Sequence, residues 1–61
     1  MSIHYIDEPH RQRVIDILST DDSDDTKQSN LKLYLISEPY FKHLASEPSW
    51  LTREIIKDFN N

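Results

Sequence analysis

Each of the three prolines in this chain is preceded by a glutamate, and each glutamate is preceded by a residue that can cap a helix. The three sites are Asp7-Glu8-Pro9, Ser37-Glu38-Pro39 and Ser46-Glu47-Pro48. The oxygen of Asp or Ser accepts hydrogen bonds from free amides at a helix start, the acid suits the positive end of the helix dipole, and proline is tolerated in the first turn. The pattern therefore predicts three helix starts within 61 residues.

Hydrophobic periodicity outlines the helices that follow these starts. The expected helices cover residues 8–19, 39–45 and 49–60. The apolar stripes expected to face the core are Val14, Ile15, Ile17 and Leu18 in the first helix and Leu51, Ile55, Ile56 and Phe59 in the last. Each stripe repeats at the three- and four-residue intervals that are typical of a helix with one buried side.

The segment 31–36 is compatible with two structures. Leu31, Leu33 and Leu35 alternate with other residue types, as they would in a strand. A strand needs a partner, and the only candidate is the segment 2–6, which would give a two-stranded sheet that is marginal by itself. We therefore expect a helix here, and the alternative is a small α+β fold in which the two segments pair.

Four aspartates close together carry the whole net charge of the chain. Asp21, Asp22, Asp24 and Asp25 have no base among them, whereas the other acids and bases cancel and the net charge is −4. A run of like charges repels itself and stays solvated. It predicts a flexible acidic loop over residues 20–30, and it offers a contact for a basic partner surface.

Together these features predict an all-α fold, a compact bundle of three to four short helices with the acidic loop after the first. Residues 1–61 can form one small domain at most, and a chain of this size buries only about 60% of the surface that it exposes when unfolded. No cysteine is present to add a disulfide. Because such short chains often gain burial by self-association, a homo-oligomer is one expected form.

The composition also bears on where the protein acts. No apolar run approaches the roughly 20 residues that a membrane span needs. Residues 1–7 lack the basic region and apolar core of a signal peptide. The absence of cysteine fits a reducing compartment. We therefore expect a cytoplasmic protein that does not act in a membrane.

Patterns for catalysis or metal binding are missing from the sequence. The histidines at positions 4, 10 and 43 have neither a second histidine one helical turn away nor a nearby nucleophile. A calcium loop starting at Asp21 would need glycine and glutamate where the chain has Thr26 and Lys32. A chain without glycine also lacks a phosphate-binding glycine loop. We expect a protein that is not an enzyme and that holds no cofactor or metal.

Trp50 is the residue that points most directly to a binding surface. It lies beside the apolar stripe of the last helix, and Trp and Arg dominate the energetics of protein interfaces. The alternative is that Trp50 folds back over Tyr40 or Phe41 and closes the core, where aromatic clusters usually lie. The predicted contacts are Trp50, Tyr40 and Phe41 as an apolar anchor, Arg53 as a further partner-binding residue, and Asp21, Asp22, Asp24 and Asp25 as the steering charges.

Residues 39–59 resemble the helix-turn-helix motif, in which a short helix, a tight turn and a longer helix follow one another. The positions that match are Leu44, Ala45 and Leu51, and those that depart from the motif are Phe41 and Glu54. The phenylalanine stands where the two helices must approach closely, and the glutamate stands at a core position. The resemblance implies DNA binding, but a net charge of −4 and the lack of a basic face argue against it.

The sequence thus predicts a small non-enzymatic regulator or adaptor that binds another protein and inhibits or masks a basic surface of that partner. The alternative is a small helix-turn-helix regulator that binds nucleic acid. A third class is a structural homodimer. A chain this short assembles a binding face on a few helices more readily than it encloses a catalytic pocket.

Overall fold

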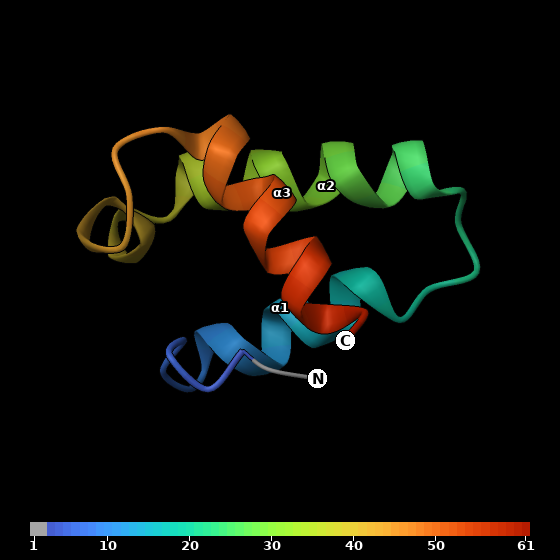
Figure 1. Ribbon diagram of the computed structural model, residues 1–61, viewed down its shortest axis with the longest axis horizontal. Coiled ribbons are helices and arrows are strands. Elements are labelled where there is room, and N and C mark those ends of the chain that lie inside the picture. Colours follow the sequence, from blue (N-terminus) through green and yellow to red (C-terminus); the bar gives the residue numbers. More distant parts are fainter. Residues whose placement is uncertain (1–2) are drawn as a thin grey trace.

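The computed structural model describes residues 3–61, which form three α-helices and one short 3-10 helix (Figure 1). The elements are α1 (His10–Leu18), α2 (Asp24–Ser37), η1 (Pro39–His43) and α3 (Pro48–Phe59). The expectation of a helical fold is confirmed. The alternative sheet is wrong for the described part of the chain, because residues 31–36 lie inside α2 and residues 3–6 form turns, while Ser2 lies outside the described residues.

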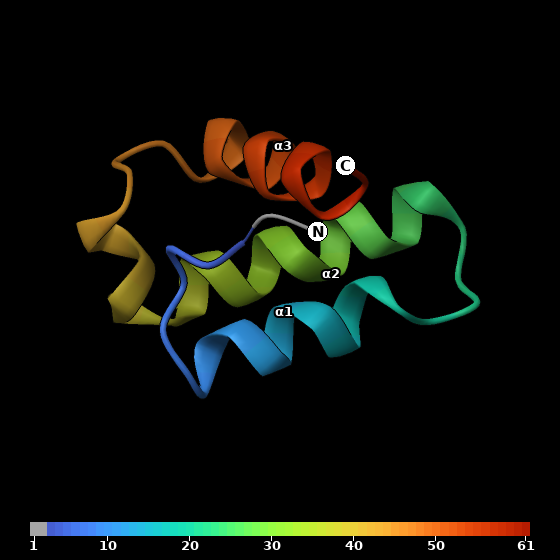
Figure 2. The same cartoon turned by 60° about the horizontal axis from the view of Figure 1, so that its bottom comes forward.

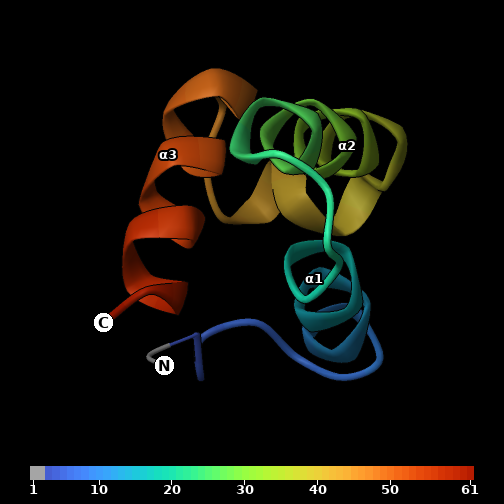
Figure 3. The same ribbon diagram turned by 90° about the vertical axis from the view of Figure 1, so that its right-hand side faces the viewer.

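α2 is the central element of the fold. α1 and α3 both pack against it, and α1 runs beside it in the opposite direction (Figure 2). α3 crosses the pair steeply, as the end-on view of α1 and α2 shows (Figure 3). The buried core residues are Ile3, Ile6, Val14, Leu18, Leu31, Leu35, Phe41, Leu51 and Ile55. Ile56 and Phe59 of the predicted α3 stripe, and Ile15 and Ile17 of the α1 stripe, pack partly buried against this core.

The segment before α1, residues 3–7, packs over the core. Ile3 and Ile6 are almost fully buried, at 2% and 0% exposure. Two tyrosine hydroxyls hold the segment: Tyr5 donates to the Asp58 carboxylate at 2.7 Å, and the amide of Asp7 donates to the hydroxyl of Tyr40 at 2.8 Å. These bonds tie the first residues to α3 and η1, far along the chain, so that no pattern local to residues 3–7 reveals them.

The acidic loop is shorter than predicted, because residues 24–30 are helical. Ser23 is the N-cap of α2, and its hydroxyl accepts a hydrogen bond from the amide of Thr26. Asp24 and Asp25 lie in the first turn, where the helix dipole favours negative charge. The acids that we expected to keep this stretch out of a helix therefore stabilise the helix start.

The prolines mark helix starts, but the capping role predicted for Asp7, Ser37 and Ser46 is wrong. η1 and α3 each begin at the proline itself, and no side chain caps them. The glutamate before each of these two prolines is extended, with φ near −105° in Glu38 and −110° in Glu47, because proline disfavours the helical conformation in the preceding residue. Ser37 belongs to the last turn of α2 and donates its hydroxyl to the carbonyl of Tyr34.

The bounds of two further helices differ from expectation. α1 begins at His10 rather than Glu8, and the Glu8 side chain pairs with Arg11 instead. The short helix expected over 39–45 is a 3-10 helix that ends at His43. Within residues 3–61, no helix combines the length and the apolar character needed to cross a membrane.

Candidate functional site: a groove between α1 and α2

The outer side of α2 carries the most exposed aliphatic side chains of the described residues. Leu33 is 65% exposed and Ile36 is 52% exposed. Leu31 and Leu35, on the inner side of the same helix, are 0% and 3% exposed. The two outer residues border two different grooves, one on each side of the helix.

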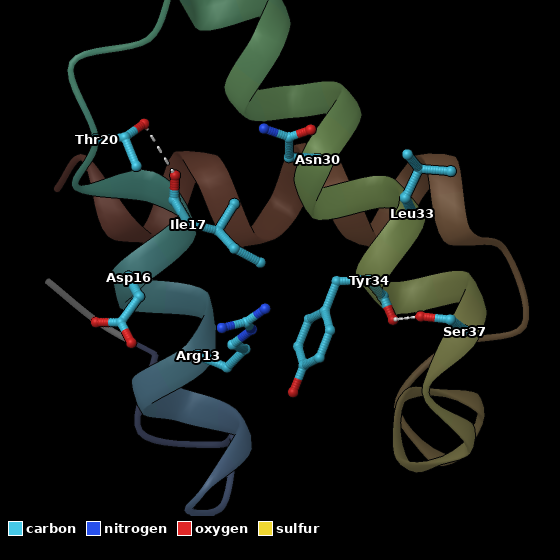
Figure 4. A pocket seen from close by; sticks show the side chains of 8 residues that line it. All are labelled: Arg13, Asp16, Ile17, Thr20, Asn30, Leu33, Tyr34 and Ser37. Carbon is cyan, nitrogen blue, oxygen red and sulfur yellow. Dashed lines mark hydrogen bonds between the residues drawn. The ribbon is translucent and has the colours of Figure 1, made fainter.

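Leu33 borders a groove of about 650 Å³ between α1 and α2 (Figure 4). Its walls are Arg13, Asp16, Ile17 and Thr20 from α1 and Asn30, Leu33, Tyr34 and Ser37 from α2, with Thr20 just after the end of α1. Both walls follow the spacing i, i+3, i+4, i+7, so the lining residues that belong to each helix lie on one side of it. Two antiparallel helices thus present matched rows of side chains to solvent.

The floor of the groove is formed by side chains that point toward one another from the two helices. Arg13 and Ile17 extend from α1 toward Tyr34 of α2 (Figure 4). The Tyr34 hydroxyl lies 3.2 Å from Nδ1 of His10, which stacks on Tyr40 at a ring distance of 4.2 Å. These contacts fix Tyr34, so the groove is preformed at this point.

The electrostatics at the Tyr34 end are mixed. Burial raises the pKa of Tyr34, Glu38 raises it further, and Arg13 acts in the opposite direction. Tyr34 is therefore a neutral hydroxyl at physiological pH. A second hollow of about 410 Å³ continues the groove past Arg13 to Pro9 and Glu38, so the groove extends along most of α1.

The other end of the groove meets the acidic connection between the helices. Thr20, which lines the groove, donates its hydroxyl to the carboxylate of Asp22 at 3.1 Å and accepts a bond from the Asp22 amide at 3.4 Å. These two bonds hold one carboxylate beside the groove. Asp21, Asp24 and Asp25 are also exposed at this end of α2.

A second groove, of about 440 Å³, lies between α2, η1 and α3. Its lining is Leu35, Ile36, Phe41, Lys42, Ala45, Ser46, Pro48 and Leu51. Four of these residues come from η1 and the irregular segment that follows it, so this groove lacks the matched helical rows of the first one.

The structure does not bring the predicted anchor residues together. Trp50 is 47% exposed on α3, whereas Phe41 is 1% exposed and belongs to the core. Within residues 3–61, the ring contacts of Tyr40 and Phe41 are with each other and with His10 and Tyr34, not with Trp50. Phe41 is therefore not available to a partner on this surface, and Trp50 does not close the core.

Arg53 is exposed on α3, one turn after Trp50, and Lys57 follows one turn later on the same side. The four aspartates are all exposed, and the ion pair found in residues 3–61 is Arg11–Glu8, which involves none of them. In this part of the chain no group of three or more His, Cys, Asp or Glu residues could hold a metal ion.

The structure also departs from the helix-turn-helix resemblance. The first helix of the motif corresponds to η1, a five-residue 3-10 helix, and α3 packs mainly against α2. Arg53 and Lys57 on the outer side of α3 are accompanied by Glu54 and Asp58 on the adjoining side. The helix that would read DNA is therefore not a basic one.

Sequence reasoning missed Leu33, Ile17 and Tyr34 as groove residues. A usable signal is present in the segment 31–36, which holds more apolar residues than one side of a helix can bury. Once the segment is helical, Leu31 and Leu35 share one side, and Leu33 must face away from it.

Comparison with known proteins gives no assignment: no protein-family model, no curated protein and no solved structure matches this chain.

Proposed function

We propose that this protein is a small non-enzymatic binding module, a regulator or adaptor that holds a helix of another protein in the groove between α1 and α2. One observation carries the proposal: two antiparallel helices present matched rows of side chains with Leu33 65% exposed, and Thr20, just after α1, is the one lining residue outside the two helices. Amphipathic helices bind grooves of this kind through apolar residues spaced at one helical turn.

The energetic reason for a partner lies in the apolar side chains of the groove. Full burial of one leucine side chain stabilises an interface by about 1.5–3 kcal/mol. Ile17 and Tyr34 are already half-buried and held by the fold, so a partner helix orders few additional side chains when it binds. Leu33 is thus the expected anchor of the interface.

The remaining predicted contacts take separate roles in this proposal. The four aspartates at the end of the groove speed the approach of a basic partner and are the part that masks its surface. Trp50 and Arg53 lie on α3 and act as a second, independent contact.

Photo-crosslinking in the source cells tests the proposal. A photo-reactive residue replaces Asn30, which lines the groove and is exposed. The variant Leu33→Gln is compared with Ile36→Gln, because both remove an exposed aliphatic residue from α2 but only Leu33 lines this groove. We expect one defined adduct that is lost with Leu33→Gln and kept with Ile36→Gln. Equal adducts in the two variants would contradict the proposal.

Light scattering separates a partner protein from a second copy of the chain. We expect the mass of a monomer for the purified protein, since the groove is then free for another protein. A dimer that Leu33→Gln dissociates would identify the homodimer as the correct class and would contradict the proposal.

The alternative function, nucleic-acid binding, rests on the exposed row of Trp50, Arg53 and Lys57 on α3. Aromatic and basic side chains in one row can stack on bases and neutralise phosphates. Titration with duplex and single-stranded DNA at low salt decides this point, because phosphate contacts are strongest there. The absence of measurable affinity at low salt would remove this alternative.

A further inference from the structure

We propose, on the basis of the function proposed above, that the occupant of the groove is an amphipathic helix with lysine or arginine at the end that lies over Thr20 and Asn30. The inference concerns the chemistry of the partner. It follows from the difference in charge between the two ends of the groove.

The Thr20 end of the groove is strongly negative. Asp22 is held beside the groove by Thr20, Asp21 and Asp25 are exposed nearby, and Asp24 lines a separate hollow between α2 and α3. None of the four takes part in the ion pair found in residues 3–61. Lys27, the nearest base along the chain, lines that separate hollow with Asp24 and forms no ion pair within 4.0 Å in the described structure. A binding partner is therefore the source of positive charge that this end lacks.

The opposite end of the groove is balanced. Arg13 and Glu38 both lie close enough to Tyr34 to act on its pKa, and they act in opposite directions. Asp16 is held by Gln12, whose amide donates to its carboxylate at 3.0 Å, and it points away from Tyr34 (Figure 4). The negative charge therefore attracts a partner helix at the Thr20 end of the groove only. Because of this asymmetry, the basic end of the partner helix lies at the Thr20 end.

The geometry sets the length and spacing of the occupant. The groove with its extension reaches from Pro9 to Thr20 along α1, which is roughly 16 Å, or about three turns of a partner helix. Apolar residues one turn apart would contact Ile17, Leu33 and Tyr34. Thr20 lies one turn beyond Ile17, so the basic residues of the partner lie one to two turns from its apolar ones, toward the Thr20 end of the groove.

A helix that displays such residues can be selected directly. A display library of three-turn helices with leucine fixed at one-turn spacing and all other positions randomised is enriched on the purified full-length protein. We expect binders in which lysine and arginine outnumber aspartate and glutamate at one end only. Leu33→Gln should lose the binders, and Ile36→Gln should keep them.

Charge variants of the protein, measured with one selected peptide, then test whether the basic end of the peptide lies at the Thr20 end of the groove. Asp21→Asn/Asp22→Asn removes two carboxylates outside α2, and Glu47→Gln/Glu54→Gln removes the same charge from the α3 side of the molecule. Because an exposed ion pair contributes about 0.2–1 kcal/mol, we expect binding about two- to thirtyfold weaker in the first variant and little change in the second. Salt should weaken binding to the wild type more than binding to the first variant.

The outcomes separate this inference from the function on which it rests. Binders that depend on Leu33 but carry no charge bias, or an acidic end, would overturn the basic-helix inference and leave the groove as a binding site. A library that yields no Leu33-dependent helix also overturns it. The proposed function itself is tested by the crosslinking and light-scattering experiments, neither of which depends on a selected peptide.

Discussion

The two sides of α2 differ sharply in solvent exposure, although both carry large aliphatic residues. Leu31 and Leu35 lie in the core at 0% and 3% exposure, while Leu33, between them, and Ile36, directly after them, are 65% and 52% exposed. The difference comes from helical phase: residues four apart lie on one side, and a residue two positions away points nearly the opposite way. Leucine on the inner side serves stability, and leucine on the outer side is available for a partner.

The largest expected effect separates these two sides. Leu31→Ala should destabilise the protein by about 2–5 kcal/mol, because it leaves a cavity in a packed core. Leu33→Ala should change stability by less than about 0.5 kcal/mol, as is usual for surface positions. Urea unfolding followed by circular dichroism measures both. Equal losses would show that Leu33 is not on a free surface.

A smaller effect tests how α2 begins. Ser23→Ala removes the side-chain bond to the amide of Thr26 and should cost about 1 kcal/mol of stability. Ser29→Ala is the matched control, since Ser29 is exposed in the middle of α2 and removal of its hydroxyl should be neutral or slightly stabilising. A shift in the urea midpoint for Ser29→Ala as large as that for Ser23→Ala would contradict the capping role.

A weaker effect concerns the segment before α1, which packs over the core. Tyr5→Phe removes the hydrogen bond to Asp58 and should cost about 0.5–1 kcal/mol near neutral pH. Burial first, and then the Asp58 bond and charge, raise the pKa of Tyr5.

The sign of the pH dependence follows from that shift. The folded state holds the Tyr5 proton more tightly than the unfolded state, so the stability from Tyr5 is complete below the unfolded pKa of about 10 and is lost as the pH rises above it. The urea midpoint of the wild type should therefore fall more steeply in alkaline solution than that of Tyr5→Phe. Parallel curves for the two proteins would rule out this contribution.

The smallest effect on stability is expected for the two variants that test the groove as a binding site. Leu33→Gln and Ile36→Gln should each change the free energy of unfolding by less than about 0.5 kcal/mol, because both side chains are exposed. Only Leu33→Gln should abolish the crosslink from position 30. A loss of folding in either variant, visible by circular dichroism, would show that the outer side of α2 contributes to the core.

The helical class and the starts at Pro39 and Pro48 were predictable, because a proline ring and an extended preceding residue act locally. The start of α2 was missed because the repulsion among the aspartates was weighed without the Ser23 cap and the favourable dipole of the first turn. The predicted anchor failed at Phe41, since a pattern of aromatic residues does not reveal which ring the other elements cover.

By itself the sequence determined the helical class, the phase of the apolar stripes in the first and last helices and the position of the negative charge, since these depend on residues within one or two helical turns. The tertiary structure decided which stripe is covered. It placed Ile3 and Ile6 over the core through bonds to Asp58 and Tyr40, and it set α1 beside α2 so that Leu33 borders an open groove. Burial depends on the whole set of packed neighbours, and most of those neighbours are distant in the chain.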